Sequence, residues 1–273
     1  MTNYILVDGS YFIFYRYYAL KSWWKLSHPD DEDIDENEFM EKFEKTFINK
    51  LSEIPKKLRV KKYTMMVAKD CRRSDIWRNQ FIGNYKGNRI NEDSTMIGNC
   101  FKIAYDKLFQ QGGCELQLYH PKLEADDCNA LTTQLLLHND FTANIWIIAN
   151  DMDYLQLASE QVNVINLKYK DITLAKHCTK NAKCDLFCKI VTGDKSDNIP
   201  SIFKKCGVKT ALKYYNDPAL FSEKLNKEPG SKELFERNKQ IIDFNCIPED
   251  LKSEFYSQYN LIINDKIENF ASG

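Results

Sequence analysis

The sequence has 273 residues, of which 43% are hydrophobic and 28% charged, and its formal net charge is −1. This length suits one large domain, or one domain with a smaller appendage, and the composition is that of an ordinary globular protein. No apolar run approaches the roughly 20 residues of a membrane span, and "MTNYILVDGS" has no basic region or cleavage site of a signal peptide. The nine cysteines have no framework spacing, so we expect reduced thiols and a cytoplasmic location.

Five short apolar runs, at 4–9, 63–68, 115–119, 144–150 and 162–167, are typical of buried strands. Helical patterns lie between them at about 36–52, 94–111 and 124–138, and further helices are predicted near 182–191, 207–215, 231–243 and 249–257. Strands that alternate with helices and are apolar throughout predict an α/β fold, with a parallel sheet covered on both faces and a helical extension after it.

Charge is distributed unevenly along the chain. Residues 30–44 hold nine acidic residues and one basic residue, whereas residues 56–89 hold eleven basic residues and two acidic ones. This asymmetry suggests a basic surface for a polyanion; the alternative is two solvated faces that partly neutralise each other. The acidic stretch near 29–37 is interpreted as a loop or insertion.

Acidic residues follow the predicted strands, where chemistry collects in open α/β sheets, and they recur in "VTGDKSDNIP". They are Asp8, Asp70, Glu124, Asp126, Asp127, Asp151, Asp153, Asp194 and Asp197. Any one of them could simply cap a helix or close a turn. Together, so many carboxylates at one sheet edge would repel each other unless cations lay among them.

A set of ligands that contains only carboxylate oxygens suits Mg²⁺ or Mn²⁺ rather than Zn²⁺. Two such ions about 4 Å apart are the usual arrangement for attack on a phosphodiester. The segment "RNQFIGNYKGNR" adds Arg78, Tyr85, Lys86 and Arg89 on a predicted helix or ordered loop. Such a segment can hold phosphates and stack on a base; the alternative is a solvated helix whose aromatic residues face the core.

The motifs "LVDGS", "YKGNR", "LEADD", "NDMDYLQL", "GDKSDNIP" and "IIDFNCIPEDL" resemble, in this order, those of the 5′-nucleases. That family includes bacteriophage 5′-exonucleases, the 5′-nuclease domain of bacterial DNA polymerase I and flap endonucleases. The resemblance implies a PIN-like nuclease domain at 1–180, with a helical gateway at about 72–92. It also implies a helical duplex-DNA-binding region at 181–273, with a helix–three-turn–helix element near 190–215.

The implied function is structure-specific 5′-3′ exonuclease or flap endonuclease activity in replication or repair, by a monomer. The implied substrates are branched or 5′-ended duplex DNA, with RNA primers or RNA–DNA hybrids as a further class. By the same resemblance, Asp8, Asp70, Glu124, Asp126 and Asp127 serve a first metal ion, some through water, and Asp151, Asp153, Asp194 and Asp197 serve a second. Arg78 and Lys86 are implied to contact the scissile phosphate as catalytic residues beside Tyr85 and Arg89, and Lys189 is a further phosphate contact.

This sequence departs from the family pattern in three places. The span from Asp8 to Asp70 is longer than usual, and the run from Asp70 to Arg78 is about one residue longer, so Asp70 is the least secure metal residue. The glycine-rich hairpin of the family, which often binds K⁺, is replaced by "SIFKKCGVKTA", which keeps only Gly207. Lys204, Lys205 and Lys209 would then hold duplex phosphates by side-chain charge.

The sequence also allows three other interpretations. His177, Cys178, Cys184 and Cys188 resemble a zinc site, but no CxxC pair occurs, and Cys184 and Cys188 fit the buried face of a helix. The absence of some of the nine acidic residues would favour a catalytically inactive, structure-specific DNA-binding protein, but all nine are present. A PIN-type ribonuclease for single-stranded RNA would be shorter and have fewer acids.

Overall fold

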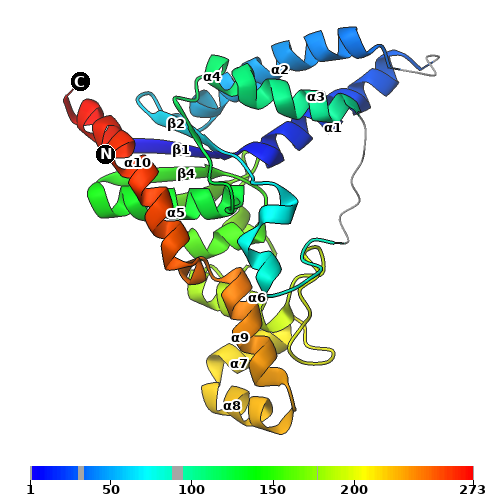
Figure 1. Ribbon diagram of the computed structural model, residues 1–273, viewed down its shortest axis with the longest axis vertical. Coiled ribbons are helices and arrows are strands. Elements are labelled where there is room, and N and C mark those ends of the chain that lie inside the picture. The colour runs from blue at the N-terminus through cyan, green and yellow to red at the C-terminus, as the bar shows by residue number, and fades with distance from the viewer. Residues whose placement is uncertain (1, 30–33, 88–94, 177, 273) are drawn as a thin grey trace.

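The computed structural model describes residues 2–29, 34–87, 95–176 and 178–272. Its centre is a five-stranded sheet in the order β3-β2-β1-β4-β5 (Figure 1). The strands are β1 (Thr2–Asp8), β2 (Thr64–Ala68), β3 (Leu116–Leu118), β4 (Ala143–Ile148) and β5 (Val162–Ile165). All four pairings are parallel. The predicted α/β fold with a parallel sheet is therefore confirmed, and each predicted strand is present.

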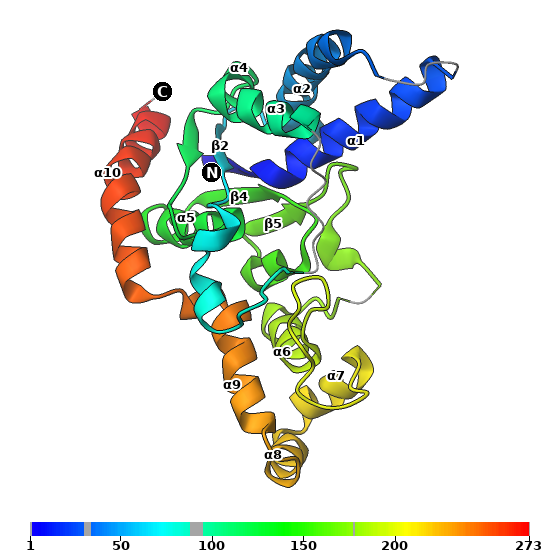
Figure 2. The ribbon, with the colours of Figure 1, turned by 45° about the vertical axis from the view of Figure 1, so that its right-hand side comes forward.

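Helices cover both faces of the sheet, because alternate strand residues point to opposite sides. Ile5 and Val7 of β1 belong to the core beneath α1 (Gly9–Ser27) and α2 (Glu36–Lys57). Tyr4 and Leu6 belong to the opposite core, with α5 (Ala125–Asn139) and α10 (Glu249–Ser272). Figure 2 shows these two helical layers on either side of the strands.

Helix α1 starts directly after β1, and Asp8 is its N-cap, accepting a hydrogen bond from the Tyr11 backbone N–H at 3.0 Å. The sequence pattern did not predict this helix. Its aromatic residues occur on all sides, with Phe12 buried and Phe14 exposed, so no polar face marks the helical period. The predicted helix at 94–111 is confirmed as α3 (Thr95–Ile103), a π-helical turn (Ala104–Leu108) and α4 (Phe109–Gln111).

The gateway segment is less helical than expected. Its described part contains two short 3₁₀ helices, Arg73–Asp75 and Trp77–Gln80, joined by turns up to residue 87. In the described part of the predicted helical gateway at about 72–92, helical structure is thus limited to these two short 3₁₀ helices. Arg89 and the rest of that segment, like the acidic residues 30–33, lie outside the described residues.

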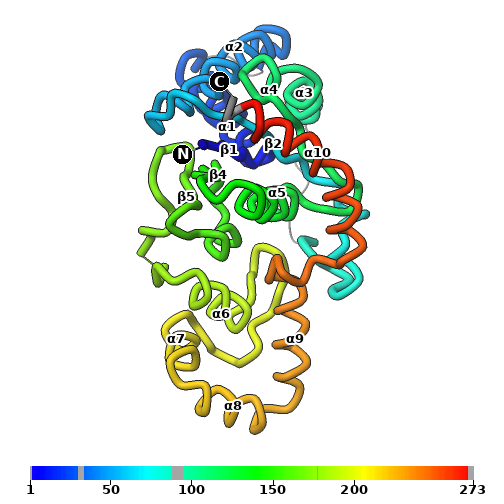
Figure 3. The backbone as a smooth tube through the Cα atoms, turned by 90° about the vertical axis from the view of Figure 1, so that its left-hand side faces the viewer, coloured from blue at the N-terminus to red at the C-terminus, as the bar shows by residue number. Residues whose placement is uncertain are grey.

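The second half of the chain is helical, as predicted, and contains α6 (Ala182–Thr192), α7 (Val208–Asn216), α8 (Pro218–Lys227) and α9 (Ser231–Ile242) before α10. Helix α8 was not predicted, although Asp217 caps it and Pro218 occupies its first turn. Helix α10 is longer than expected and runs back along the sheet domain (Figure 3). Its Phe255, Tyr259 and Ile263 lie in the same core as Leu131 of α5, so residues 181–273 do not form a separate body.

No helix among the described residues combines the length and the apolar character needed to cross a membrane.

Candidate active site

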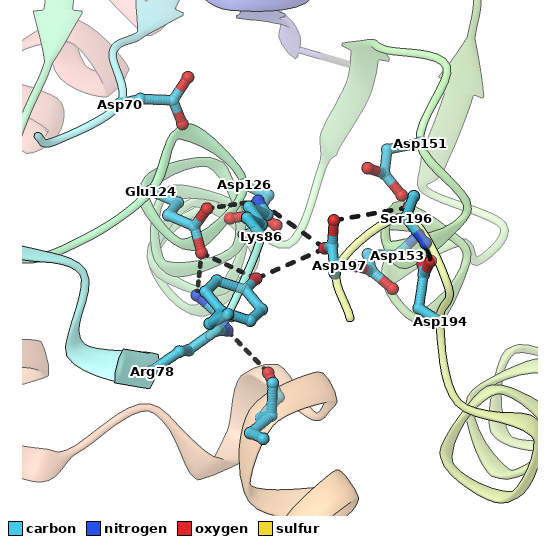
Figure 4. Close-up of polar contacts among 12 residues, drawn as sticks. Asp70, Arg78, Lys86, Glu124, Asp126, Asp151, Asp153, Asp194, Ser196 and Asp197 are labelled. Atoms are coloured by element: carbon cyan, nitrogen blue, oxygen red, sulfur yellow. Dashed lines mark hydrogen bonds and ion pairs between the residues drawn. The ribbon is translucent and has the colours of Figure 1, made fainter. Parts of the chain in front are cut away.

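A pocket of about 420 Å³ lies at the C-terminal edge of the sheet. It is lined by Asp8, Asp70, Lys86, Asp126, Asp151, Lys189 and Asp194, with Ser10 and Ser196 among the smaller residues. In Figure 4, Glu124 and Asp126 lie on one side and Asp151, Asp153 and Asp194 on the other, with Asp197 between them. The parallel strands bring these carboxylates together because their C-terminal ends share one sheet edge.

The first carboxylate group is fixed by the start of α5. Glu124 is the N-cap and forms a capping box with Asp127, whose side chain accepts the Glu124 backbone N–H at 3.1 Å. Oxygens of Glu124, Asp126 and Asp127 lie within 4.8 Å of one another. Asp126 lines the pocket, whereas Asp127 is fully buried and accepts a hydrogen bond from Trp77 Nε1 at 2.9 Å. Asp127 therefore accepts buried protein donors, while Asp126 accepts the Asp127 backbone N–H at 2.7 Å and still lines the pocket.

Arg78 is the main partner of Asp127. Its two terminal nitrogens donate to both Asp127 oxygens at 2.7 and 2.6 Å, and Nη1 also donates to Glu124 at 3.0 Å. Its Nε donates to the Ile241 carbonyl oxygen at 2.7 Å (Figure 4). Only 2% of Arg78 is exposed. The placement therefore differs from the expected contact with the scissile phosphate, because carboxylates and a carbonyl already engage the guanidinium. Arg78 instead ties the start of α5 to the end of α9.

Tyr85 and Lys86 also reach Glu124. The Tyr85 hydroxyl donates to Glu124 Oε2 at 3.1 Å, and the ring is buried. Burial leaves the ring no face for stacking on a base, in contrast to the expectation. The Lys86 ammonium pairs with Glu124 and lies 3.8 Å from Asp197 Oδ2, and its backbone N–H donates to the Asp197 carbonyl oxygen at 3.0 Å. Lys86 lines the pocket between the two carboxylate groups.

The second carboxylate group surrounds Lys189 of α6. The Lys189 ammonium pairs with Asp153, lies 3.1 Å from Asp194 Oδ2 and lies 3.8 Å from Asp151 Oδ1. Asp194 also accepts hydrogen bonds from the Ser196 backbone N–H at 2.7 Å and from the Ser196 hydroxyl at 2.6 Å.

The loop that carries Asp194 depends on Gly193. Gly193 has a φ of +69°, and a Cβ there would lie 2.4 Å from the Ile199 carbonyl oxygen. The turn is closed by Ile199, whose N–H donates to Asp194 O at 2.7 Å. A glycine is thus required for the fold of this loop.

Asp8 and Asp70 complete the pocket with help from residues that the sequence analysis missed. The Tyr154 hydroxyl donates to Asp8 Oδ2 at 3.0 Å. Asp70 accepts hydrogen bonds from the Ser10 hydroxyl and, at 2.8 Å, from the Ala125 backbone N–H. Ser10 stands in the quoted "LVDGS" motif, so its position two residues after Asp8 was the available signal.

The pocket raises the pKa of several of its carboxyl groups. Burial, together with the charge of Asp70, raises the pKa of Asp8 from 3.8 to about 7. Burial raises the pKa of Asp153 to about 6, partly opposed by Lys189, and burial and Asp127 hold the pKa of Asp126 well above its usual range. Burial also acts on Asp194, but Lys189 and Ser196 outweigh it and lower its pKa to about 2.

We call the two carboxylate groups around the pocket the carboxylate basin. The raised pKa values mean that Lys86 and Lys189 do not neutralise all of its negative charge. Carboxyl groups that resist ionisation at neutral pH are stabilised as anions by added cations. The donors are carboxylate and hydroxyl oxygens at a histidine-free pocket, which is the chemistry of Mg²⁺ and Mn²⁺ sites. The residues present therefore fit divalent metal ions.

Of the other predicted nucleic-acid contacts that the structure describes, Lys189 lines the pocket, and Lys204, Lys205 and Lys209 lie outside it. Lys204 and Lys205 are exposed in the loop between α6 and α7, and Lys209 is exposed on the first turn of α7. The α6–loop–α7 unit occupies the place predicted for the helix–three-turn–helix element. Cys184 and Cys188 pack in the core with Val191 and Phe203, as expected for the buried face of a helix. All nine cysteines are free thiols, and His177 lies outside the described residues.

Comparison with known proteins agrees with this architecture. The family described as "5'-3' exonuclease, N-terminal resolvase-like domain" matches residues 3–185. Ribonuclease H of Enterobacteria phage T4 is 25% identical over 258 residues, which cover 86% of this chain and 81% of that protein. The 5'-3' exonuclease of Buchnera aphidicola subsp. Acyrthosiphon pisum is 27% identical over 244 residues, which cover 87% of this chain and 78% of that protein.

Two solved structures share the fold. The bacteriophage T5 flap endonuclease, in a pseudo-enzyme-product complex with DNA and metal ions, has a TM-score of 0.68 at 16% identity and covers 96% of this chain and 99% of its own. The T5 5'-exonuclease with bound zinc has a TM-score of 0.65 at 17% identity and covers 94% and 97%. The family match extends over more than half of the sequence and includes both sides of the pocket except Lys189 and the loop of Asp194 and Asp197. The chain therefore belongs to the 5′-3′ exonuclease family.

Proposed function

We propose that this protein is a structure-specific 5′-nuclease that hydrolyses phosphodiester bonds of branched or 5′-ended duplex DNA with two divalent cations. The observation that carries the proposal is the pair of carboxylate groups facing each other across one pocket, with Lys86 and Lys189 among them. Two metal ions held by these groups would supply a deprotonated attacking water and stabilise the charge that develops on the phosphate.

We propose that each carboxylate group binds one metal ion. Asp8, Asp70, Glu124 and Asp126 would hold the first ion, and Asp151, Asp153, Asp194 and Asp197 the second. We omit Asp127 from the ligands, because Arg78 and Trp77 engage both of its oxygens. We propose Mg²⁺ or Mn²⁺, since oxygen-only sites favour these ions.

Lys86 and Lys189 are the basic residues that we propose for phosphate contact. Both line the pocket, and each is held by carboxylates that metal ions would engage. Their ammonium groups would then be available for the phosphate, where they matter most as negative charge builds up. Arg78 has a positioning role: it fixes Glu124 and Asp127 and thereby the start of α5.

Duplex binding is proposed for the α6–α7 unit. Lys204, Lys205 and Lys209 are exposed there, and lysines at this spacing can bind phosphates of one strand. Potassium is not part of the proposal, because the predicted hairpin retains only Gly207. RNA–DNA hybrids are a second substrate class, since the related phage T4 protein carries the name ribonuclease H. We propose that the protein acts as a monomer.

The alternatives are less well supported. An inactive DNA-binding protein needs no basin of carboxyl groups whose pKa values are raised at a cost to stability. A PIN-type ribonuclease for single-stranded RNA does not need the helices α6 to α9 that extend beyond the sheet (Figure 1).

The test is cleavage of a 5′-labelled flap DNA and a 5′-RNA–DNA hybrid in Mg²⁺, Mn²⁺ or EDTA. We expect cleavage of the flap DNA with either metal and none in EDTA. Asp126→Asn and Asp153→Asn should remove most turnover and leave flap binding intact, whereas Asp250→Asn, an exposed acid on α10, should change neither. Full activity in EDTA contradicts the metal mechanism, and near wild-type turnover of either basin variant removes that residue from the ligands.

A further inference from the structure

A second hollow, of about 330 Å³, adjoins the active-site pocket at Asp70. Ser10 and Asp70 line both cavities, so the two spaces meet at the edge of the carboxylate basin. Figure 4 shows Asp70 apart from the other labelled carboxylates, on the side of the basin away from Asp194. The other walls include Lys69, Phe101, Lys102 and Tyr105.

Lys69 supplies a positive charge to this hollow and contacts aromatic rings there. Its ammonium lies 4.8 Å from the ring centroid of Tyr105 and 5.6 Å from that of Tyr119. Within the described ranges, no carboxylate forms an ion pair with Lys69, whereas Lys102 pairs with Asp106 at 3.1 Å. Lys86 and Lys189 are likewise held by carboxylates. Lys69 therefore offers a positive charge to a ligand without first breaking an ion pair.

Aromatic rings form the other part of the hollow. Phe101 and Tyr105 lie with ring centroids 6.4 Å apart, and Tyr105 stands in the π-helical turn of residues 104–108. Such turns often occur at functional sites. The Tyr105 hydroxyl is buried beside the Ser10 side chain and makes no hydrogen bond of normal geometry with the described residues. Space for it depends on Gly9, where a Cβ would lie 2.4 Å from the hydroxyl oxygen.

We propose that this hollow is a subsite for the 5′-terminal nucleotide of the strand being cut, with its 5′-phosphate at Lys69 and its base against Phe101 and Tyr105. The inference rests on the proposed nuclease function, because the hollow adjoins the place of phosphodiester cleavage. Its volume lies within the roughly 300–1,000 Å³ of small-molecule sites. Aromatic faces accept any base, and a lysine with a neighbouring hydroxyl donor suits a phosphate. The subsite would make the enzyme prefer 5′-phosphorylated ends that are cut one nucleotide at a time.

The experiment compares single-turnover release of the first nucleotide from a nicked duplex whose downstream strand begins with a 5′-phosphate or a 5′-hydroxyl. With enzyme in excess of substrate but below saturation, wild-type protein should cut the phosphorylated strand about tenfold faster, the effect expected of one hydrogen-bonded charge. Lys69→Met should abolish this preference by slowing only the phosphorylated strand, and Lys69→Arg should keep it. Tyr105→Phe should reduce it, and Lys61→Met, an exposed lysine before β2, should leave it unchanged.

The outcomes separate this inference from the proposed function. No metal-dependent cleavage of either strand by wild-type protein would reject the nuclease proposal itself. Cleavage of both strands at equal rates, or a preference that survives in Lys69→Met, would overturn the subsite and leave the nuclease proposal standing. Calorimetric titration of the EDTA-treated protein gives a check without turnover: deoxyadenosine 5′-monophosphate should bind more tightly than deoxyadenosine, and Lys69→Met should remove the difference. Equal binding of the two would also overturn the subsite.

Discussion

The Lys189 ammonium lies 3.1 Å from Asp194 Oδ2, inside the carboxylate group that also contains Asp151 and Asp153. Lys189 is mostly buried there and offsets part of the negative charge of the group. Lys189→Met should therefore lower the stability of the EDTA-treated protein by about 2 kcal/mol, because it leaves buried carboxylates without their counter-charge. Urea denaturation measures this change.

The same variant should lose much of that defect in Mg²⁺, since a bound cation replaces the missing charge. Lys183→Met, on the same helix but exposed, is the matched control and should have no effect in either condition. A Lys189→Met defect that is equal with and without Mg²⁺ would show that Lys189 acts only in packing α6.

The pKa of Asp8 predicts how stability depends on pH. Because burial and Asp70 raise it from 3.8 to about 7, the folded protein keeps a proton that the unfolded chain has released at intermediate pH. This contribution to stability is full below about pH 4 and is lost as the pH rises through 7. The lowered pKa of Asp194 acts only at acidic pH, outside this window.

The melting temperature of EDTA-treated protein should thus fall between pH 5 and pH 8, by roughly 5 °C, or about 2 kcal/mol for a chain of this size. Asp8→Asn should make the profile shallower, because the amide does not titrate, while Asp153, whose pKa is raised to about 6, still contributes a slope in this range. Mg²⁺ should raise the melting temperature most at pH 8. A flat wild-type profile in EDTA would contradict the assigned shift.

The buried Arg78–Asp127 pair predicts a stability effect rather than a purely catalytic one. Arg78→Met leaves Asp127 buried without its cationic partner, with Trp77 as its remaining side-chain donor, and should destabilise the protein by about 3–5 kcal/mol. Adding Asp127→Leu should restore much of the loss, because the unpaired charge is then removed. Denaturant titration of both variants checks this. If Arg78→Met keeps wild-type stability and loses turnover, the residue contacts substrate after all.

Lys86 should behave differently from Arg78. Its ammonium lines the pocket, so Lys86→Ala should lower single-turnover cleavage at saturating enzyme by roughly 10²-fold, as other lost electrostatic donors do. Low salt should not restore the rate, because the missing charge acts in the transition state rather than in binding. Lys61→Ala is the charge-only control. A Lys86→Ala rate within a few-fold of wild type would limit Lys86 to electrostatic guidance.

The strands and the convergence of the carboxylates could be read from the sequence, because apolar runs ending in Asp8, Asp70 and Asp151 are local patterns. The contacts that individual side chains make could not be predicted in this way. The local sequence fits both an exposed and a buried placement of Arg78 and Tyr85. Their burial depends on contacts with Glu124 and Ile241, which lie far along the chain. The packing of α10 against α5 could not be predicted either, since the aromatic residues of α10 do not show which helix they contact.

The most direct test of the account is the Mg²⁺ dependence of single-turnover flap cleavage. If each carboxylate group binds one catalytic ion, the rate should rise with about the second power of Mg²⁺ concentration below saturation. Asp126→Asn and Asp194→Asn, one from each group, should each require more Mg²⁺ and reach a lower maximum. A first-power dependence in the wild type, with one of these variants unaffected, would contradict the two-ion basin.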